Sequence, residues 1–218
     1  MPRWRNWQTR SLEEAVPQGV EVQVLSSAHT SSFMKLILGS QSLSRKIVLE
    51  RAGYHFDVMQ ADIDEKVIRS DNFFELPLLL ARAKAKSLLN RISEPALLIT
   101  LDQVVVCNGV LREKPETKEQ AKEYLESYSV FPAETITAIV VTNTTNGKQQ
   151  EGVDVSKIFF NPIPSDVVVE LIQEGKIFQA AGGFMVEHPI IRPYINRIEG
   201  IEGLPLLLIE RLINEVRD

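Results

Sequence analysis

A long apolar run in the middle of the chain, residues 97–106, constrains the fold more than any other segment. The segments on either side of Asp102 are rich in β-branched and aliphatic side chains, and Asn108-Gly109 after them is a typical tight-turn pair. The run therefore predicts buried strands with a carboxylate inside or beside them. Because an unpaired buried carboxylate costs free energy, Asp102 should meet a metal, a cation or several hydrogen-bond donors. The alternative is a structural Asp102 that caps a bend.

Size and composition indicate one ordinary globular domain. The chain has 218 residues, of which 44% are hydrophobic and 24% charged, values close to the globular average. Strand and helix patterns begin near Lys35, so we expect one domain over residues 34–218. Residues 1–33 contain closely spaced Trp and Arg residues, followed by a Ser-rich stretch, and show no helix or strand pattern. We expect them to form an unstructured or artefactual extension outside the fold.

Charge and cysteine content argue against several protein classes. The formal net charge of −5 disfavours nucleic-acid binding, which needs a basic face, so a phosphorylated ligand would require cations gathered locally. Cys107 is the only cysteine and lies in an apolar run, where we expect an inert core thiol. The three histidines are too scattered to predict a zinc site. No stretch approaches the ~18 apolar residues of a membrane span, so we expect a cytoplasmic protein with no membrane partner.

The first segment with a regular pattern, residues 35–51, predicts a strand, a loop and a helix. Residues 35–38 form a buried-strand run, residues 39–42 a polar loop, and Ser42 is the expected N-cap of a helix through Arg51. Such a unit directs backbone N–H groups at the space above the loop and can bind an anion. Most connections of this kind are purely structural, and that interpretation also stays open.

Further patterns predict helices, hairpins and a mixed sheet. They predict a helix over residues 74–89, a capping box at 117–120 that opens a helix reaching 128, a strand over 135–142, a hairpin at Asn146-Gly147, a helix capped by Ser165 and closed by Gly175, a short strand after Gly182-Gly183, and a last helix from Pro205. Strands and helices that alternate, with long hairpins in the middle, predict an α/β or α+β fold.

Polar side chains stand at the ends of several predicted elements. They are Ser42, Arg45, Glu65, Lys84, Asp102 and Lys114. Each is weak evidence by itself, because most helical and loop lysines lie on solvated faces. Glu65 follows a short strand edge, and Asp102 is the most informative of the set because of the apolar run around it.

The order of these short motifs resembles the Maf family, the septum-formation-inhibitor homologues that act as nucleoside triphosphate pyrophosphatases. The matching stretches are LILGSQSLSRK (36–46), DE (64–65), LARAKA (80–85), DQVV (102–105), KP (114–115) and GLP (203–205). No single motif is specific, but their order and intervals across nearly all of residues 35–218 are.

The resemblance implies a fold, an activity and a site. The fold would be similar to that of inosine triphosphatase, an elongated mixed sheet flanked by helices with a central cleft. The activity would convert nucleoside triphosphates, including non-canonical or modified ones, to a monophosphate and pyrophosphate. It would need Mg²⁺ or Mn²⁺, held by Glu65 and Asp102, and the protein would be a homodimer. Catalytic roles would fall on Asp102, Glu65 and Lys84, and substrate-binding roles on Ser40, Ser42, Arg45, Lys84, Lys114 and Glu187.

Some positions depart from the family pattern. Leu43-Ser44 stands in place of the usual Pro-Arg, which removes one loop cation, and Gln103 stands where Thr is usual. Glu187 stands in a stretch where the family carries a neutral amide. We expect these changes to affect the preferred nucleotide more than the reaction.

Two other functions stay open. The first is a non-catalytic nucleotide-binding regulator of cell division on the same fold, against which the retained Glu65 and Asp102 argue, since a binder needs no water-activating carboxylate. The second is a dinucleotide-binding module, which is weak because residues 39–44 contain no G-x-G-x-x-G motif.

Overall fold

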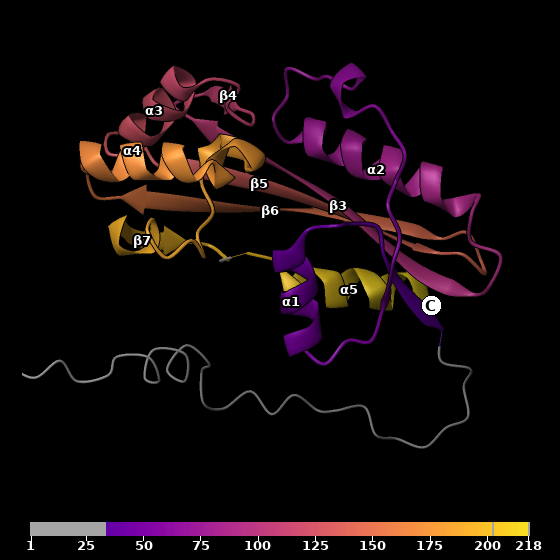
Figure 1. The fold of residues 1–218 in the computed structure, drawn as a ribbon. Coiled ribbons are helices and arrows are strands. Elements are labelled where there is room, and N and C mark those ends of the chain that lie inside the picture. Colours follow the sequence, from indigo (N-terminus) through magenta and orange to yellow (C-terminus); the bar gives the residue numbers. More distant parts are fainter. Residues whose placement is uncertain (1–33, 202, 218) are drawn as a thin grey trace, which may run out of the picture. The chain divides into compact units, whose positions relative to one another are not determined.

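The structure is a computed structural model in which residues 34–201 and 203–217 are described. Their strands form one seven-stranded sheet (Figure 1). The strands are β1 (Lys35–Leu38), β2 (Asp57–Val58), β3 (Ala96–Cys107), β4 (Val110–Arg112), β5 (Ala133–Asn143), β6 (Gln149–Phe160) and β7 (Ile195–Glu199). The α-helices are α1 (Leu43–Arg51), α2 (Glu75–Leu89), α3 (Lys118–Ser127), α4 (Ser165–Glu174) and α5 (Leu206–Arg217). Short 3₁₀ helices are η1 (Glu65–Val67), η2 (Lys176–Gln179), η3 (Ala181–Gly183) and η4 (Arg192–Tyr194).

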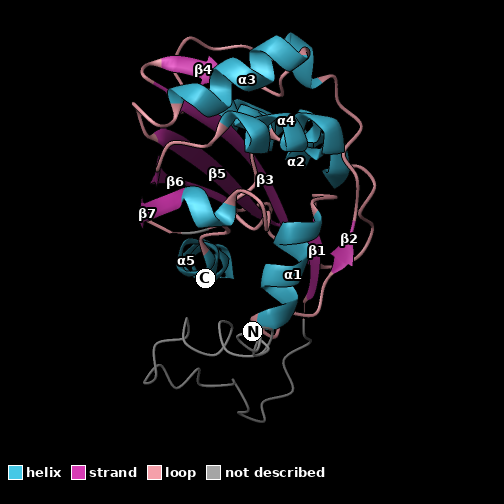
Figure 2. Cartoon of the chain, turned by 60° about the vertical axis from the view of Figure 1, so that its left-hand side comes forward, coloured by secondary structure: helices cyan, strands magenta, loops and turns pink. Residues whose placement is uncertain are grey.

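The sheet is mixed, with the order β2-β1-β3-β5-β6-β7 and β4 as a second partner of β3. β1 runs parallel to both β2 and β3, whereas β3, β5, β6 and β7 pair antiparallel in succession. Figure 2 shows the short β2 at one edge and β7 at the other. The prediction of a mixed α/β fold with long central hairpins is confirmed. None of the described helices is long and apolar enough to cross a membrane. The predictions for residues 1–33 lie outside the described residues.

β3 continues without interruption through Asp102. Its pairing with β5 is unbroken from Leu97↔Asn143 to Cys107↔Ala133 and includes Asp102↔Ala138. The alternative in which Asp102 caps a bend is therefore wrong. β5 supplies a ladder partner for the whole stretch, so the chain has no need to turn at the carboxylate.

Alternate residues of β3 pack against different helices, as the pleat of a strand requires. Leu97, Ile99 and Leu101 pack with α1 and α5, Leu98, Val104 and Val106 pack with α2, and Val105 and Cys107 pack with α3 and α4. Figure 1 shows α2 and α5 on opposite sides of the long strands. The odd-numbered residues of β3 thus enter two separate apolar clusters, with Gln103 between them. Cys107 is buried, as predicted for a core thiol.

One edge of β3 has a gap beside Asp102. β1 pairs with β3 only as far as Leu38↔Ile99, and β4 pairs with it only from Val105↔Arg112 onward. Between these points no strand of the described residues covers that edge. The chain leaves β1 at Gly39, whose N–H donates to Ile99 O at 2.7 Å. The chain passes close to β3 at Gly39. A Cβ there would lie 2.6 Å from Thr100 Cγ2, so only glycine fits at this position.

Several local predictions are confirmed. α2 covers Glu75–Leu89, close to the expected helix over residues 74–89. Thr117 caps α3, its Oγ1 accepting a hydrogen bond from Gln120 N at 3.1 Å. Asn108 and Gly109 both have positive φ, 49° and 71°, in the turn that joins β3 to β4.

Two local predictions are wrong. Ser165 is the first residue of α4 rather than its cap, because the extended Pro164 takes the N-cap position. Gly182-Gly183 does not lead directly into a strand, and the next strand is β7. Gly182 instead donates its N–H to Glu113 O at 3.1 Å and accepts a hydrogen bond from the Tyr128 hydroxyl at 2.7 Å. These bonds tie η3 to the chain after β4 and to the end of α3.

Candidate active site

A pocket of about 1370 Å³ opens at the gap in the edge of β3. Its walls come from the start of α1, η1, α2, β3, the end of β4 and residues 178–187. Every site residue predicted from the sequence lines it, namely Ser40, Ser42, Arg45, Glu65, Lys84, Asp102, Lys114 and Glu187. The topology explains why, since β1 and β4 end on either side of the gap and deliver their following loops to it.

Lys84 joins the two predicted carboxylates. Its Nζ lies 2.5 Å from Asp102 Oδ1 and 2.9 Å from Glu65 Oε1. The side chains of Lys84 and Asp102 are only 12% and 13% exposed, whereas that of Glu65 is 55% exposed. Thr100, which shares a face of β3 with Asp102, donates its hydroxyl to Ala81 O of α2 at 2.8 Å. This bond fixes α2 against β3 one helical turn before Lys84.

The electrostatics of Asp102 are set by burial and by charged neighbours. Burial raises the pKa of Asp102 above its ordinary value, and the positive charges of Lys84 and Arg45 offset this only in part. Burial also lowers the pKa of the Arg45 guanidinium, which the charges of Asp102 and Glu65 oppose. A carboxylate with a raised pKa in a polar pocket is suited to accept a proton.

The loop before α1 presents hydroxyl and N–H groups to the pocket. Ser40 Oγ accepts hydrogen bonds from Arg45 Nη1 at 3.2 Å and from Ser42 N at 3.3 Å. Ser42 stands at the N-cap of α1 as expected, but its side chain does not cap the helix, and its Oγ lies 3.0 Å from Ser44 Oγ. The first N–H groups of α1 therefore lack a side-chain acceptor from Ser42, which leaves them for an anion.

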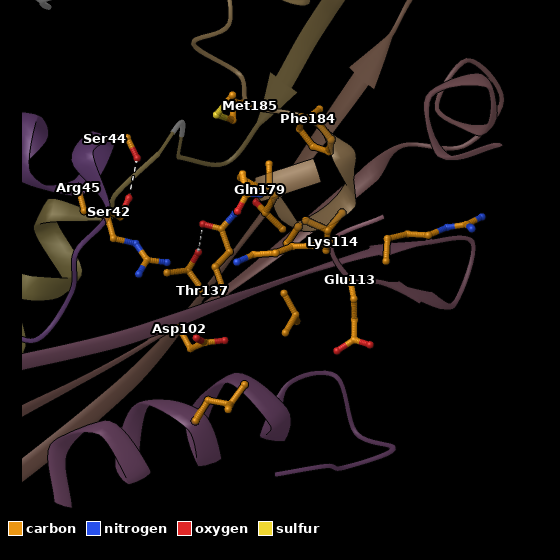
Figure 3. A pocket seen from close by; sticks show the side chains of 18 of the residues that line it. Ser42, Ser44, Arg45, Asp102, Glu113, Lys114, Thr137, Gln179, Phe184 and Met185 are labelled. Carbon is orange, nitrogen blue, oxygen red and sulfur yellow. Dashed lines mark hydrogen bonds between the residues drawn. The ribbon is translucent and has the colours of Figure 1, made fainter. Parts of the chain in front are cut away.

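Lys114 and Glu187 stand at the exposed rim of the pocket. Figure 3 shows Arg45 and Lys114 entering the pocket from opposite sides, with Asp102 below them. Neither Lys114 nor Glu187 forms an ion pair with another described residue. Both charges are therefore available to a ligand.

The sequence did not indicate several residues of the pocket. Thr137, Gln179 and Met185 line it and are labelled in Figure 3. A signal existed for Thr137, because the polar Thr135 and Thr137 alternate with the apolar Ile136 and Ala138 along β5. Gln179 and Met185 lie on a 3₁₀ helix and a loop, where no periodic pattern marks a residue that faces a pocket.

The carboxylates of Glu65 and Asp102 are the candidate ligands for a divalent metal in this pocket. No group of three or more His, Cys, Asp or Glu side chains among the described residues could hold an ion by itself. Glu65 and Asp102 nevertheless lie close together, since both contact Lys84 Nζ, and an ion held by both carboxylates would share them with this ammonium group. Mg²⁺ commonly takes one or two carboxylates and completes its shell with water and substrate phosphates. This donor pair fits such an ion.

Comparisons with known proteins agree with the geometry. A 7-methyl-GTP pyrophosphatase of Dictyostelium discoideum is 44% identical over 192 residues, covering 83% of this chain and 96% of the relative. A dTTP/UTP pyrophosphatase of Vibrio vulnificus is 31% identical and covers 83% of this chain and 98% of the relative. The crystal structure of a nucleoside-triphosphatase / dITP/XTP pyrophosphatase of Mycobacterium abscessus has a TM-score of 0.41 and 11% identity over 84% of this chain and 96% of that one, a likeness too slight to support an argument.

The family comparison covers nearly the whole described domain. The family described as Maf-like protein matches residues 35–216, a range that holds all the pocket residues predicted from the sequence. Together with the first of the relatives, this shows that the chain belongs to the Maf family.

Proposed function

We propose that this protein hydrolyses the α–β phosphoanhydride of a nucleoside triphosphate and releases a nucleoside monophosphate and pyrophosphate. The observation that carries the proposal is the convergence of Asp102, Glu65 and Lys84 in one pocket that Arg45 and Lys114 also line. Hydrolysis of a phosphoanhydride needs an oriented water, a proton acceptor and charge neutralisation, and this set can supply all three.

The cations and the loop before α1 bind the triphosphate. Arg45 and Lys114 approach from opposite sides and neutralise its negative charge. Ser40, Ser42 and the first N–H groups of α1 donate hydrogen bonds to phosphate oxygens. The overall charge of the protein is negative, so these local groups must provide the attraction for the substrate.

The carboxylates orient and activate the attacking water. Asp102 accepts its proton, a role favoured by the raised pKa of this buried carboxyl group. Lys84 holds the Asp102 carboxylate in place through their short contact. Glu65 and Asp102 are the residues that would hold Mg²⁺ or Mn²⁺, which when bound supplies positive charge to the phosphate oxygens.

Among substrates, 7-methyl-GTP is the first to test. The relative with 44% identity bears that substrate in its name, and other relatives are named for dTTP and UTP. Methylation at N7 gives guanine a positive charge, and Glu187 is an exposed carboxylate on the rim without an ion-pair partner among the described residues. Glu187 would attract the methylated base by this charge.

The test is a pyrophosphate-release assay. The panel contains 7-methyl-GTP, GTP, UTP, dTTP, ATP and CTP, each with Mg²⁺, with Mn²⁺ and with EDTA. We expect release that needs a divalent metal. Nucleotide binding without release under any condition would instead support the non-catalytic regulator of cell division. The homodimer and the cytoplasmic location remain predictions, the first of which sedimentation of the purified protein would test.

A further inference from the structure

Glu187 lies in a tight turn at the rim of the pocket. His188 N donates to Met185 O at 3.0 Å and closes a four-residue β-turn in which Val186 and Glu187 are the central residues. A second turn begins at the same histidine, because Ile191 N donates to His188 O at 3.0 Å. The first three residues of the turn line the pocket, and His188 lies behind them, outside the lining. His188 therefore joins the turn that carries Glu187 to the chain that follows it.

The His188 side chain is buried against the end of α4. Its exposed fraction is only 3%, and its Nε2 lies 2.7 Å from Oε2 of Glu174, the last residue of α4. The other oxygen of that carboxylate, Oε1, accepts a hydrogen bond from Lys176 Nζ. The Nδ1 atom of the imidazole is also buried and has no hydrogen-bond partner among the described residues. The direction of the ring therefore depends on its contact with Glu174.

The end of α4 gives this contact a well-defined position. Gly175 closes the helix with a φ of 81°, and its N–H donates to Leu171 O at 3.2 Å. Leu171 and Val168 are fully or almost fully buried and pack α4 into the apolar cluster that it shares with α3. A turn that is held by Glu174 is therefore held to the packed core of the domain.

A polar side chain at position 188 is unexpected from its surroundings. Val186, Ile190 and Ile191 all pack against the apolar cluster of α3 and α4, so an apolar residue between them would also suit burial. A buried polar contact adds little net stability, because both groups lose their hydration. It does restrict the chain to few arrangements, since the polar atoms need each other as partners. The contact between His188 and Glu174 is therefore suited to set the direction of the turn.

We propose that His188 is a positioning residue, whose contact with Glu174 holds the turn 185–188 so that the Glu187 carboxylate meets the base of the substrate. This inference rests on the proposed function. His188 does not touch the substrate and acts through Glu187. The hydrolytic groups come from β3, η1 and α2, so a displaced turn leaves them in place. Loss of the contact should therefore weaken the recognition of a positively charged base and spare the hydrolysis of GTP.

The experiment removes the contact from either side. His188→Leu and Glu174→Leu each leave the turn without its polar contact to the end of α4. We expect each change to lower the ratio of kcat/KM for 7-methyl-GTP over GTP about threefold to tenfold, mainly through a higher KM for 7-methyl-GTP. The kcat for GTP should stay within about twofold of the wild type. His188→Gln places an amide nitrogen near the position of Nε2 and should keep the wild-type ratio.

A double variant distinguishes positioning from a general effect on stability. In Glu187→Gln the carboxylate that the turn presents is already lost, so the addition of His188→Leu should not lower the ratio further. A general loss of structure would instead lower kcat/KM for both nucleotides, with or without the Glu187 carboxylate.

The chain offers a matched control for each side of the contact. Glu170→Leu removes an exposed carboxylate one turn earlier in α4, and His55→Leu removes an exposed imidazole, and neither residue lines the pocket. Both changes should leave the ratio within about twofold of the wild type. Thermal melts of all variants show whether a lost ratio comes from unfolding. If His188→Leu does not fold, Glu174→Leu makes the same test with the buried ring retained.

The outcomes separate the inference from the proposed function. Folded His188→Leu and Glu174→Leu proteins with unchanged ratios overturn the role of His188, and so does an unchanged ratio in Glu187→Gln. A wild type that releases no pyrophosphate overturns the proposed function. In that case the equilibrium binding of 7-methyl-GTP and GTP in EDTA measures the same preference, with the same variants and the same expected fall in the ratio.

Discussion

Asp102 and Gln103 are adjacent in sequence and point to opposite faces of β3. Asp102 lies on the face covered by α2 and contacts Lys84, whereas Gln103 lies on the other face and accepts the Thr137 hydrogen bond. Both nevertheless line one pocket, because the edge of β3 beside them has no strand partner among the described residues. In the proposed function Asp102 accepts a proton from the attacking water, and Gln103 borders the same pocket from the other face of the strand.

Replacement of Asp102 by Asn should abolish turnover while the protein stays folded. The amide cannot accept a proton from water, and loss of a general base costs about 10²- to 10⁴-fold in rate. Lys84 retains its ion pair with Glu65, so its positive charge still has a carboxylate partner. Pyrophosphate release measures the loss, and near-ultraviolet circular dichroism measures the fold.

Asp166→Asn is the control for this change. Asp166 is an exposed carboxylate in the first turn of α4, away from the pocket, and its replacement should leave turnover intact. Full turnover by the purified Asp102→Asn protein would contradict the role assigned to Asp102.

Lys84→Met should move the acidic limb of the pH profile to higher pH. Asp102 acts in its ionised form, and the positive charge of Lys84 lowers the pKa of that carboxyl group. Without the Lys84 charge the pKa of Asp102 rises, so a smaller fraction of the protein has an ionised Asp102 at a given acidic pH. The profile of kcat/KM against pH measures the shift. Lys86→Met, an exposed lysine of the same helix, should leave the limb in place. A limb that stays or moves to lower pH in Lys84→Met would argue against ionised Asp102 as the base.

The sequence predicts the elements of this fold better than the shape of its site. Apolar runs and Asn-Gly turns mark the long hairpin strands, because these signals act within a few residues. The gap beside Asp102 instead depends on where β1 and β4 stop pairing with β3, which is a long-range property. The register of β5 likewise decides that Thr137 meets Gln103. The cap of α4 shows a local limit, since Pro164 and Ser165 both suit a helix start and only the backbone decides between them.

Gly39→Ala should destabilise the protein by about 1–3 kcal/mol, the usual cost of an added methyl in a packed core. The new Cβ would lie 2.6 Å from Thr100 Cγ2 and 2.8 Å from Leu88 Cδ1, both inside the core. Urea denaturation measures the free energy of unfolding. Gly53→Asn is the control, because asparagine tolerates the φ of +82° there and no atom lies within 4 Å of an added Cβ. If the free energy of unfolding of Gly39→Ala equals that of the wild type, the close approach of residue 39 to β3 does not require glycine.

Glu187→Gln should reduce the preference for 7-methyl-GTP over GTP and leave the turnover of GTP nearly unchanged. The two substrates differ by the methyl group and the positive charge that it brings, so a carboxylate distinguishes them and its neutral amide does not. Because Glu187 is exposed, we expect an effect of about threefold to tenfold in the ratio of kcat/KM, decreasing with salt. The measurement is that ratio at low and high ionic strength. Glu170→Gln, an exposed carboxylate of α4 outside the pocket, should change neither value. If the ratio in Glu187→Gln equals that of the wild type at low salt, the charge of the methylated base is recognised elsewhere or not at all.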